Sequence, residues 1–476
     1  MRLPPRSVLV VLAIAVLNLG TLHSWGFYTR AAFLAVLGAW GLSVLALFAE
    51  PTAACPRRNF LGALLIVPLS WILTFAAIIT PTLLYAEDFS ARFHLWLSSY
   101  LGCLSVCLLP ASLLGLVGGP RPRWWHRALF VIIPSSTVVL GLTTRALTLV
   151  ASPDPVIDVY PLLSEGADHI LQGRNPYAHD IQSPYGTDRA KKFGVGETPD
   201  PRPAGYPPLP LLLSIPPRWF GADVRWSNVI ADVLAGLALG VLGWRHHPRF
   251  FGIVAMATYL NAVRVPFIIE QAWYEPMIAA LLGWGLVFVT RPGGPRFLGH
   301  LLLGLALTAK QFGLPLLFPL LAAFRYQWKL LTAGVLIGLA LMLPWFLASP
   351  HDFLDIVLWK HLQRPVQYGS VTLASWLYHE WGLTLPRAIG WGLAVVLIAL
   401  FSYRSMRDPT NVALGLGTVL LTFCLCHTQG YFNYFYLTQY LWLFGFVSNL
   451  PTQMLGSIEG TSQADNLPSP KAASSL

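Results

Sequence analysis

Long apolar runs alternate with short polar segments along most of the sequence. Each run approaches the roughly 20 residues that an α-helix needs to cross the hydrocarbon core of a bilayer. The pattern predicts about fourteen membrane-spanning helices. We expect them at residues 7–22, 31–49, 60–83, 95–117, 128–150, 226–243, 250–267, 270–290, 297–310, 311–324, 330–348, 386–402, 410–427 and 433–449.

One polar, proline-rich stretch, residues 151–225, interrupts this pattern and holds nine of the 21 acidic residues of the chain. So apolar a chain has little reason to keep such a loop unless the loop works at the membrane surface. The expected fold is an all-α polytopic membrane protein with one large external loop that carries short juxtamembrane helices. We expect five helices in 1–150, the loop in 151–225, a transmembrane bundle in 226–449 and a disordered cytoplasmic tail in 450–476.

Composition excludes a soluble protein. Hydrophobic residues make up 55% of the chain and charged residues only 11%, with a mean hydropathy of +0.59. Soluble domains carry about 25% charged residues. The net charge of +10 would suggest a nucleic-acid partner in a soluble chain. Here the basic residues lie in short loops between apolar runs, where they orient helices, so no nucleic-acid partner is expected.

The short basic loops all fall on one side of the predicted membrane, which the positive-inside rule makes cytoplasmic. These clusters are Arg2/Arg6, Arg57/Arg58, Arg121/Arg123/Arg127, Arg245/Arg249, Arg291/Arg296, Arg325/Lys329 and Arg404/Arg407. The loops 151–225 and 349–385 then face outward. The run 207–221 is too short between its proline pairs to span the bilayer. Residues 297–324 have basic clusters at both ends, so they are expected to form a helical hairpin with Lys310 toward the outer surface.

Ionisable residues inside the predicted spans are costly to bury and are candidates for function. On this topology they gather in the outer half of the membrane, which predicts a polar cavity beneath the acidic loop. They are Arg145, Asp232, Arg264, Glu270, Glu275, Lys310 and His427. Each also has a structural interpretation: the two arginines can reach the lipid headgroups, Asp232 can bond across helices, and Glu270 can pair with Arg264.

Such a cavity suits the transfer of a sugar from a lipid-linked phosphate. A carboxylate on a water-facing loop can take a proton from an incoming hydroxyl. Cations at the lipid boundary can hold the phosphate and stabilise its charge as it leaves. The phosphate departs as a stable anion, so no general acid is required, unlike in glycoside hydrolysis.

Several motifs carry a family resemblance. They are Pro155-Val-Ile-Asp158, Gly166-Ala167, Leu171-x-Gly173-Arg-Asn-Pro-Tyr177, Tyr206-Pro-Pro-Leu209, Gly304-Leu-Ala-Leu-Thr-Ala-Lys310-Gln and His361-Leu-Gln-Arg364-Pro. Over residues 150–445 the chain resembles the GT-C superfamily of glycosyltransferases, and it is most similar to the bacterial polyprenyl-phosphate-mannose-dependent mannosyltransferases. The resemblance implies a multi-pass protein of the bacterial inner membrane whose active site faces the periplasm. It also implies a polyprenyl-phosphate-linked hexose donor, mannose above others, and a glycan or glycolipid acceptor.

The resemblance implies an acidic base in the first large external loop, which corresponds to Asp158. Family members usually begin that loop after their first span, whereas about four extra spans precede it here. Asp154 is the competing base. Pro153 and Pro155 favour an extended or turn conformation around Asp154, so Asp158 is preferred. An Asp-x-Asp motif is absent from the sequence, and neither a metal nor another cofactor is expected.

The remaining candidates would bind the two substrates. Lys310 is the first choice for the donor phosphate, followed by Arg364 and Arg264. Candidates for the sugar and the acceptor are Asn175, Tyr177, Tyr206, Glu270, Gln311, His427 and Gln429. For Asn175 and Tyr177, a purely structural turn is the stronger interpretation.

Two other functions stay open at this point. A ligase or polymerase of lipid-linked glycans would share the external loop and the cationic cavity, and the sequence does not separate its donor from a monosaccharide phosphate. A secondary transporter would also need buried charges, but it would show inverted repeats and sites at the middle of the membrane. Neither feature is evident in the sequence.

Overall fold

A computed structural model describes residues 4–49, 64–79, 83–85, 124–185, 204–244, 250–262, 264–408 and 411–450. Within these residues every secondary-structure element is a helix. The N-terminal part contains α1 (Arg6–Thr21), α2 (Arg30–Phe48), α4 (Ile66–Ile79) and α6 (Trp124–Ala151). The polar loop contributes α7 (Val159–Leu171) and α9 (Pro208–Trp219).

The bundle that follows begins with α10 (Trp226–Trp244), α11 (Phe250–Leu260), α12 (Val265–Glu270), α13 (Glu275–Thr290), α14 (Arg296–Thr308), α15 (Gly313–Ala323) and the short η2 (Arg325–Gln327). It continues with α16 (Trp328–Ala340), α17 (Leu343–Ala348), α18 (Pro350–Leu354), η3 (Asp355–Trp359), α19 (Lys360–Gln363) and α20 (Leu373–Trp381). It ends with α21 (Arg387–Arg407), α22 (Val412–Cys426) and α23 (Phe432–Ser448).

Helix ends follow from local sequence. The Thr29 side chain accepts a hydrogen bond from the Ala32 N–H at 3.0 Å and begins α2. Thr372 caps α20 in the same way, accepting from the Ser375 N–H at 3.1 Å. Gly382, with φ of 64°, ends α20 in the left-handed conformation that glycine adopts without steric cost. Caps of this kind satisfy backbone groups that a helix end would otherwise leave without partners.

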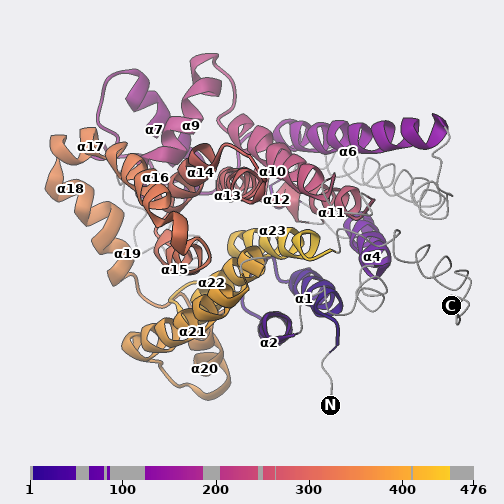
Figure 1. Cartoon of the computed structure of the whole chain (residues 1–476). Coiled ribbons are helices and arrows are strands. Elements are labelled where there is room, and N and C mark those ends of the chain that lie inside the picture. Colours follow the sequence, from indigo (N-terminus) through magenta and orange to yellow (C-terminus); the bar gives the residue numbers. More distant parts are fainter. Residues whose placement is uncertain are drawn as a thin grey trace, which may run out of the picture.

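The core lies around α22 and α23, which are buried along almost their whole length. The α1–α2 hairpin packs against these two helices, and α10 and α13 pack against α23 from elsewhere in the chain (Figure 1). The N-terminal helices therefore form part of the same bundle as the C-terminal ones. A helix buried on all sides reads as uniformly apolar, which explains the weak amphipathic pattern of α22 and α23.

Some of the predicted spans correspond to one long helix, whereas others correspond to a shorter helix or to two helices. Among the described residues, four helices are long and apolar enough to cross a membrane: α2, the Val131–Ala151 part of α6, α10 and α21. Others are shorter; α14 has 13 residues, and at about 1.5 Å per residue it rises roughly 20 Å, less than the hydrocarbon thickness. The predicted spans 250–267 and 330–348 are each divided between two helices. The number of about fourteen spans stays a prediction.

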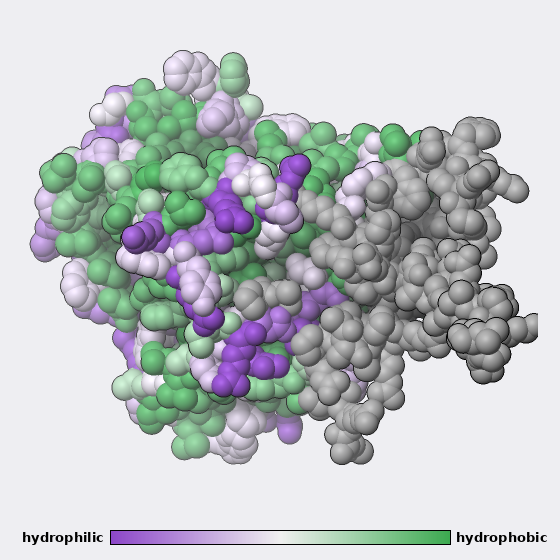
Figure 2. Space-filling view, in the orientation of Figure 1, coloured by the Kyte–Doolittle hydropathy of each residue, from purple (hydrophilic) through white to green (hydrophobic). Residues whose placement is uncertain are grey.

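Some expectations concern residues outside the described ranges. The predicted span 95–117 and residues 451–476 of the predicted tail lie there entirely, as do residues 60–63 and 80–82 of the predicted span 60–83. In the polar loop, the run 207–221 corresponds to α9, which packs on α7. Figure 2 shows apolar side chains over much of the visible surface, with hydrophilic side chains gathered across the middle of that face.

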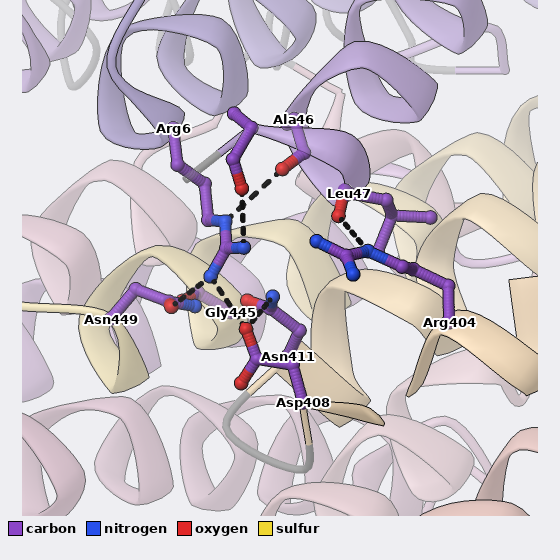
Figure 3. A network of polar contacts seen from close by, with 9 residues as sticks. Arg6, Ala46, Leu47, Arg404, Asp408, Asn411, Gly445 and Asn449 are labelled. Carbon is purple, nitrogen blue, oxygen red and sulfur yellow. Dashed lines mark hydrogen bonds and ion pairs between the residues drawn. The ribbon is translucent and has the colours of Figure 1, made fainter. Parts of the chain in front are cut away.

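Arg6 joins four helices at one end of the bundle (Figure 3). Its buried guanidinium donates to the carbonyls of Ala46 at 3.1 Å and Ala49 at 2.7 Å, at the end of α2. It also donates to Asn449 at 3.0 Å and forms an ion pair with Asp408 at 3.1 Å. These contacts bring the start of α1 together with the ends of α2, α21 and α23, and they satisfy a charge that would otherwise be buried alone.

Candidate active site

A cavity of about 300 Å³ lies where several helix ends meet. Its wall includes the start of α7, the α12–α13 link, the α14–α15 turn, the η3–α19 segment and the α22–α23 link. The loop between α1 and α2 completes it through Trp25 and Phe27. Pockets that bind small molecules are largely apolar with a few polar groups directed inward, and this cavity has that character.

The cavity collects seven of the residues proposed from sequence and excludes five. Those that line it are Asp158, Tyr206, Lys310, Gln311, Arg364, His427 and Gln429. Asp154, Asn175, Tyr177, Arg264 and Glu270 are described by the structure but do not line it. The seven come from five separate segments of the chain, so only the fold brings them into one cavity.

Asp158 directly precedes α7, and its side chain does not cap that helix. The position suits a negative charge because the N-terminus of a helix carries a partial positive charge. The Tyr185 hydroxyl donates to the Asp158 carboxylate at 3.2 Å and accepts from the Asp158 N–H at 3.1 Å. Burial, together with the nearby Asp158 charge, raises the pKa of Tyr185 well above its usual value. Tyr185 therefore stays protonated and orients the carboxylate.

Asp154 is exposed and lies outside the cavity. The backbone just before it is fixed, because the buried Arg225 donates to the carbonyls of Ser152 at 2.8 Å and Pro153 at 3.2 Å. Asp223 pairs with Arg225 and balances its charge. The two aspartates that sequence offered as bases thus occupy different environments, and only Asp158 faces the cavity.

Lys310 lies in the turn between α14 and α15 and is 9% exposed. Its ammonium forms an ion pair with Glu275, the first residue of α13. The Asn433 amide donates to the same carboxylate oxygen at 2.6 Å. The rings of Tyr274 and Tyr434 lie 4.7 Å and 5.1 Å from the ammonium, within the range of cation–π attraction. The positive charge of Lys310 is therefore largely compensated within the protein.

Arg364 follows α19 and is half-buried. It donates to the Gln429 side chain at 2.9 Å, and Gln429 in turn donates to the Tyr434 hydroxyl at 3.1 Å. Among the ion pairs of the described residues, none includes Arg364. A guanidinium with a neutral partner keeps its charge and most of its donors for an anion.

Gly205 provides a fixed backbone carbonyl behind the cavity. The Gln311 amide donates to this oxygen at 3.2 Å and to the Val357 carbonyl at 3.1 Å, while His361 Nε2 donates to it at 2.8 Å. These bonds hold the polar loop to the α14–α15 turn and to the η3–α19 segment. His361 was not among the residues proposed from sequence.

Tyr177 and Asn175 support the wall from outside. The Asn175 side chain accepts from the Tyr177 N–H at 3.0 Å, which is a local turn. Tyr177 is fully buried, and its hydroxyl donates to the Tyr206 carbonyl at 2.7 Å. Tyr206, which does line the cavity, packs edge-to-face on Tyr274 with ring centroids 5.0 Å apart.

The other intramembrane charges fall into two groups. Arg145 on α6 pairs with the fully buried Asp232 on α10, which also accepts from the hydroxyls of Tyr259 and Tyr436. This cluster is separate from the residues that line the cavity. His427 does line it, and its ring lies 4.6 Å from Phe423 and 5.1 Å from Trp391. The expectation that all these charges share one cavity therefore holds for some of them and not for others.

Arg264 and Glu270, at the two ends of α12, contact the N-terminal part of the chain. The Arg264 guanidinium lies 3.7 Å from the centroid of the Trp25 ring and donates to the Leu22 carbonyl. The Glu270 carboxylate accepts from the N–H groups of Leu84 at 2.7 Å and Tyr85 at 2.8 Å. Both side chains are buried.

Three aromatic cavity residues escaped the sequence argument: Trp25, Phe27 and Tyr185. They lie outside the motifs, whereas His361 lies in one of them but was given no function. The described residues contain no group of three His, Cys, Asp or Glu side chains that could hold a metal ion. The absence of a metal requirement stays a prediction.

The described structure is that of a helical membrane protein with a carboxylate and cations lining one cavity. The profile of glycosyltransferase family 87 matches residues 205–428, from the start of α9 to the end of α22. On this match the protein is a glycosyltransferase. No curated protein and no solved structure matches the chain significantly. Asp158, Tyr185 and the N-terminal helices precede the matched segment.

Proposed function

We propose that the enzyme transfers a hexose, mannose above others, from a polyprenyl-phosphate donor to a hydroxyl of a glycan or glycolipid acceptor. The reaction would take place at the periplasmic face of the bacterial inner membrane. The observation that carries the proposal is that Asp158, Arg364 and Lys310 line one cavity. A base for the acceptor and cations for the leaving phosphate are the two parts that this reaction needs.

Asp158 would be the base. Its carboxylate is held by Tyr185 and takes the proton of the acceptor hydroxyl as the oxygen attacks the anomeric carbon of the donor sugar. The bond from that carbon to the phosphate oxygen breaks, and polyprenyl phosphate leaves as an anion. Asp154, which is exposed and outside the cavity, would not take part.

Arg364 would be the main contact of the donor phosphate. Sequence ranked Lys310 first, but Lys310 pairs with Glu275, whereas Arg364 has a neutral partner in Gln429. A guanidinium can also bind a phosphate through two parallel hydrogen bonds. Lys310 would add a second, weaker positive contribution from behind its aromatic and carboxylate neighbours.

The donor lipid would enter beside α15 and α19. Leu314, Leu358 and Leu362 line the cavity and are also 64%, 41% and 44% exposed. Apolar side chains that face both the interior and the surroundings suit a long isoprenoid chain lying partly in the bilayer. A donor that were a soluble nucleotide sugar would not need such an edge.

Helix directions support an outward cavity. The α13–α14 link lies at the far ends of two helices whose other ends, at Glu275 and near Lys310, reach the cavity. That link carries Arg291 and Arg296, and the Arg6 cluster likewise lies at helix ends remote from the cavity. By the positive-inside rule the basic end is cytoplasmic, so the cavity would open to the periplasm.

The test is turnover by purified protein in detergent with a panel of polyprenyl-phosphate hexoses and with an oligosaccharide diphosphate lipid. We expect transfer from a monosaccharide phosphate. Asp158→Asn should lower turnover by about a hundredfold or more while donor binding survives. Asp154→Asn is the matched control and should have a much smaller effect.

Three results would contradict the proposal. Turnover only with the diphosphate donor would make the enzyme a ligase or polymerase. Near-normal turnover of Asp158→Asn would remove the proposed base. Normal donor kinetics after Arg364→Met would remove the proposed phosphate contact.

A further inference from the structure

The loop between α1 and α2 enters the cavity from outside the segment that matches the glycosyltransferase family. Trp25 and Phe27, both half-buried, line the cavity together with residues of the matched segment. The hairpin thus supplies part of the wall, in addition to packing against α22 and α23.

Backbone contacts fix this loop in place. The Tyr28 N–H donates to the Gly369 carbonyl at 2.7 Å, and Phe27 pairs with Ser370 as an isolated β-bridge. Gly26, with φ of 78°, lies so close to the start of α23 that an added Cβ would be 2.6 Å from the Phe432 nitrogen. Only glycine fits this close approach. The contact therefore fixes how far Trp25 and Phe27 extend into the cavity.

Two buried charges hold the N-terminal region against the matched segment. Arg264 binds Trp25 and the Leu22 carbonyl, and Glu270 binds the backbone of Leu84 and Tyr85. Leu84 and Tyr85 also line the cavity. Both ends of α12 therefore hold N-terminal residues at the site. Burying a full charge at each contact is costly unless the contact is well formed.

The backbone is strained at this wall. Two non-glycine residues in the described part of the chain have positive φ: Trp25 at 54° and Ala272 at 53°. Trp25 lines the cavity, and Ala272 lies between two lining residues, Gln271 and Trp273. Left-handed backbone is unfavourable for residues other than glycine and is concentrated at functional sites. Here the strain places two indole rings in one wall.

This wall differs in chemistry from the leucine-lined edge. Trp25 and Trp273 each pack on Phe267, with ring centroids 4.9 Å and 5.3 Å apart. The buried Gln271 amide adds a hydrogen-bonding group beside them. A sugar ring offers a flat face of C–H bonds and a rim of hydroxyls, which fits aromatic faces next to an amide. An isoprenoid chain is a hydrocarbon and has no group that could form a hydrogen bond with the amide.

The wall also reaches the reacting groups. Phe27 packs edge-to-face on Tyr431, with ring centroids 6.1 Å apart. Tyr431 lines the same cavity as Asp158 and Arg364. A ring held by the aromatic wall would therefore share this cavity with the proposed base.

We propose that the N-terminal region forms an acceptor subsite in which Trp25, Phe27 and Trp273 bind a carbohydrate ring. The acceptor is then a glycan or a glycolipid headgroup, and its hydroxyl is presented to Asp158. The assignment of this ring to the acceptor rests on the proposed function. The presence of a carbohydrate subsite at these aromatic residues does not.

The test is binding of methyl glycosides and disaccharides of mannose, glucose and galactose to the protein in nanodiscs, without donor. We expect saturation-transfer NMR to detect at least one of these ligands. Trp25→Ala should raise its Kd about tenfold, comparable to the loss of one good aromatic contact, and Trp25→Phe should raise it less. The control is Trp40→Phe in the same hairpin, which removes a 2.8 Å hydrogen bond to Thr422 outside the cavity and should leave Kd unchanged.

Thermal unfolding of each variant separates binding from folding. If Trp25→Ala does not fold, Phe27→Leu gives the same information, because it keeps an apolar side chain and removes the ring. Wild-type protein that binds none of the glycosides would overturn the subsite, as would unchanged Kd in folded Trp25→Ala and Phe27→Leu. Donor hydrolysis with water as acceptor is measured in parallel. Its absence would count against the proposed donor and leave the result on the glycosides standing.

Discussion

The two ends of the helix bundle use buried charge in opposite ways. At the Arg6 end, each nitrogen of the guanidinium donates to a carbonyl, an amide oxygen or the Asp408 carboxylate, and the cluster does not line the cavity of the candidate site (Figure 3). At the other end, Arg364 has a neutral partner, Asp158 is held by a tyrosine, and both face open space.

The difference shows that a charge inside the membrane does not mark a site by itself. The Arg145–Asp232 pair is at least as deeply buried as Lys310, yet it does not line the cavity, and two tyrosine hydroxyls donate to Asp232. A charge becomes available for a ligand when its partners leave it uncompensated and a cavity lies in front of it. By that criterion Arg364 and Asp158 qualify, whereas Arg6, Arg145 and Asp232 stabilise the fold.

The largest effect is expected at the Arg6 end of the bundle. Arg6→Met should lower the free energy of unfolding by about 3–5 kcal/mol, because it removes the buried ion pair with Asp408 and the hydrogen bonds to Ala46, Ala49 and Asn449. Unfolding in detergent, followed by heat or denaturant, measures the change. The double variant Arg6→Met/Asp408→Asn should recover part of the loss. Protein that remains folded should keep its donor KM. An altered donor KM with unchanged stability would mean that Arg6 acts on the substrate and does not stabilise the fold.

Lys310 stands between the two kinds of charge, and Glu275 allows its contributions to be separated. Lys310→Met should destabilise the fold and raise the donor KM by about tenfold or more. Adding Glu275→Gln removes the unpaired carboxylate, so stability should largely return while the donor KM stays high. If both the stability and the donor KM return to the wild-type values in the double variant, Lys310 serves only as the partner of Glu275.

Tyr185 should have a smaller effect. Tyr185→Phe keeps the ring and removes both hydrogen bonds between the hydroxyl and Asp158. Loss of the bond to the carboxylate, worth about 1 kcal/mol, should lower turnover roughly fivefold. Because the tyrosine acts by orienting the base, donor KM should not change. A changed donor KM with unchanged turnover would contradict this positioning function.

Sequence periodicity was sufficient to find the helices, since helices lie in most of the predicted spans within the described residues. It was insufficient to find their breaks: the divisions between α11 and α12 and between α16 and α17 lie inside the predicted spans 250–267 and 330–348. An apolar run indicates only that a segment is buried. A continuous helix and a broken helix are buried alike, so the run does not show where a break lies. The element α12 in particular depends on contacts with the N-terminal region that no local pattern encodes.

Motifs located half of the candidate site. Asp158, Lys310 and Arg364 stand in recognisable runs, and the cavity collects all three. Arg264 and Glu270 were proposed for substrate because they are charged and intramembrane, but their partners are Trp25, Leu22, Leu84 and Tyr85. The Lys310–Glu275 pair joins residues 35 positions apart on different helices, and nothing in the sequence links them.

The last prediction concerns two variants that should keep full activity, and it tests which end of the bundle faces outward. His351 lies in the segment that leads to Arg364, and its side chain is 94% exposed. Pro292 is exposed in the α13–α14 link, at the end remote from the cavity. On intact cells, His351→Cys should react with a membrane-impermeant thiol reagent above the background of the native cysteines, and Pro292→Cys should react only after lysis. Neither residue lines the cavity, so turnover should stay at the wild-type level. The reverse labelling would turn the cavity toward the cytoplasm. A periplasmic acceptor would then be impossible, although the roles of Asp158 and Arg364 in transfer would stand.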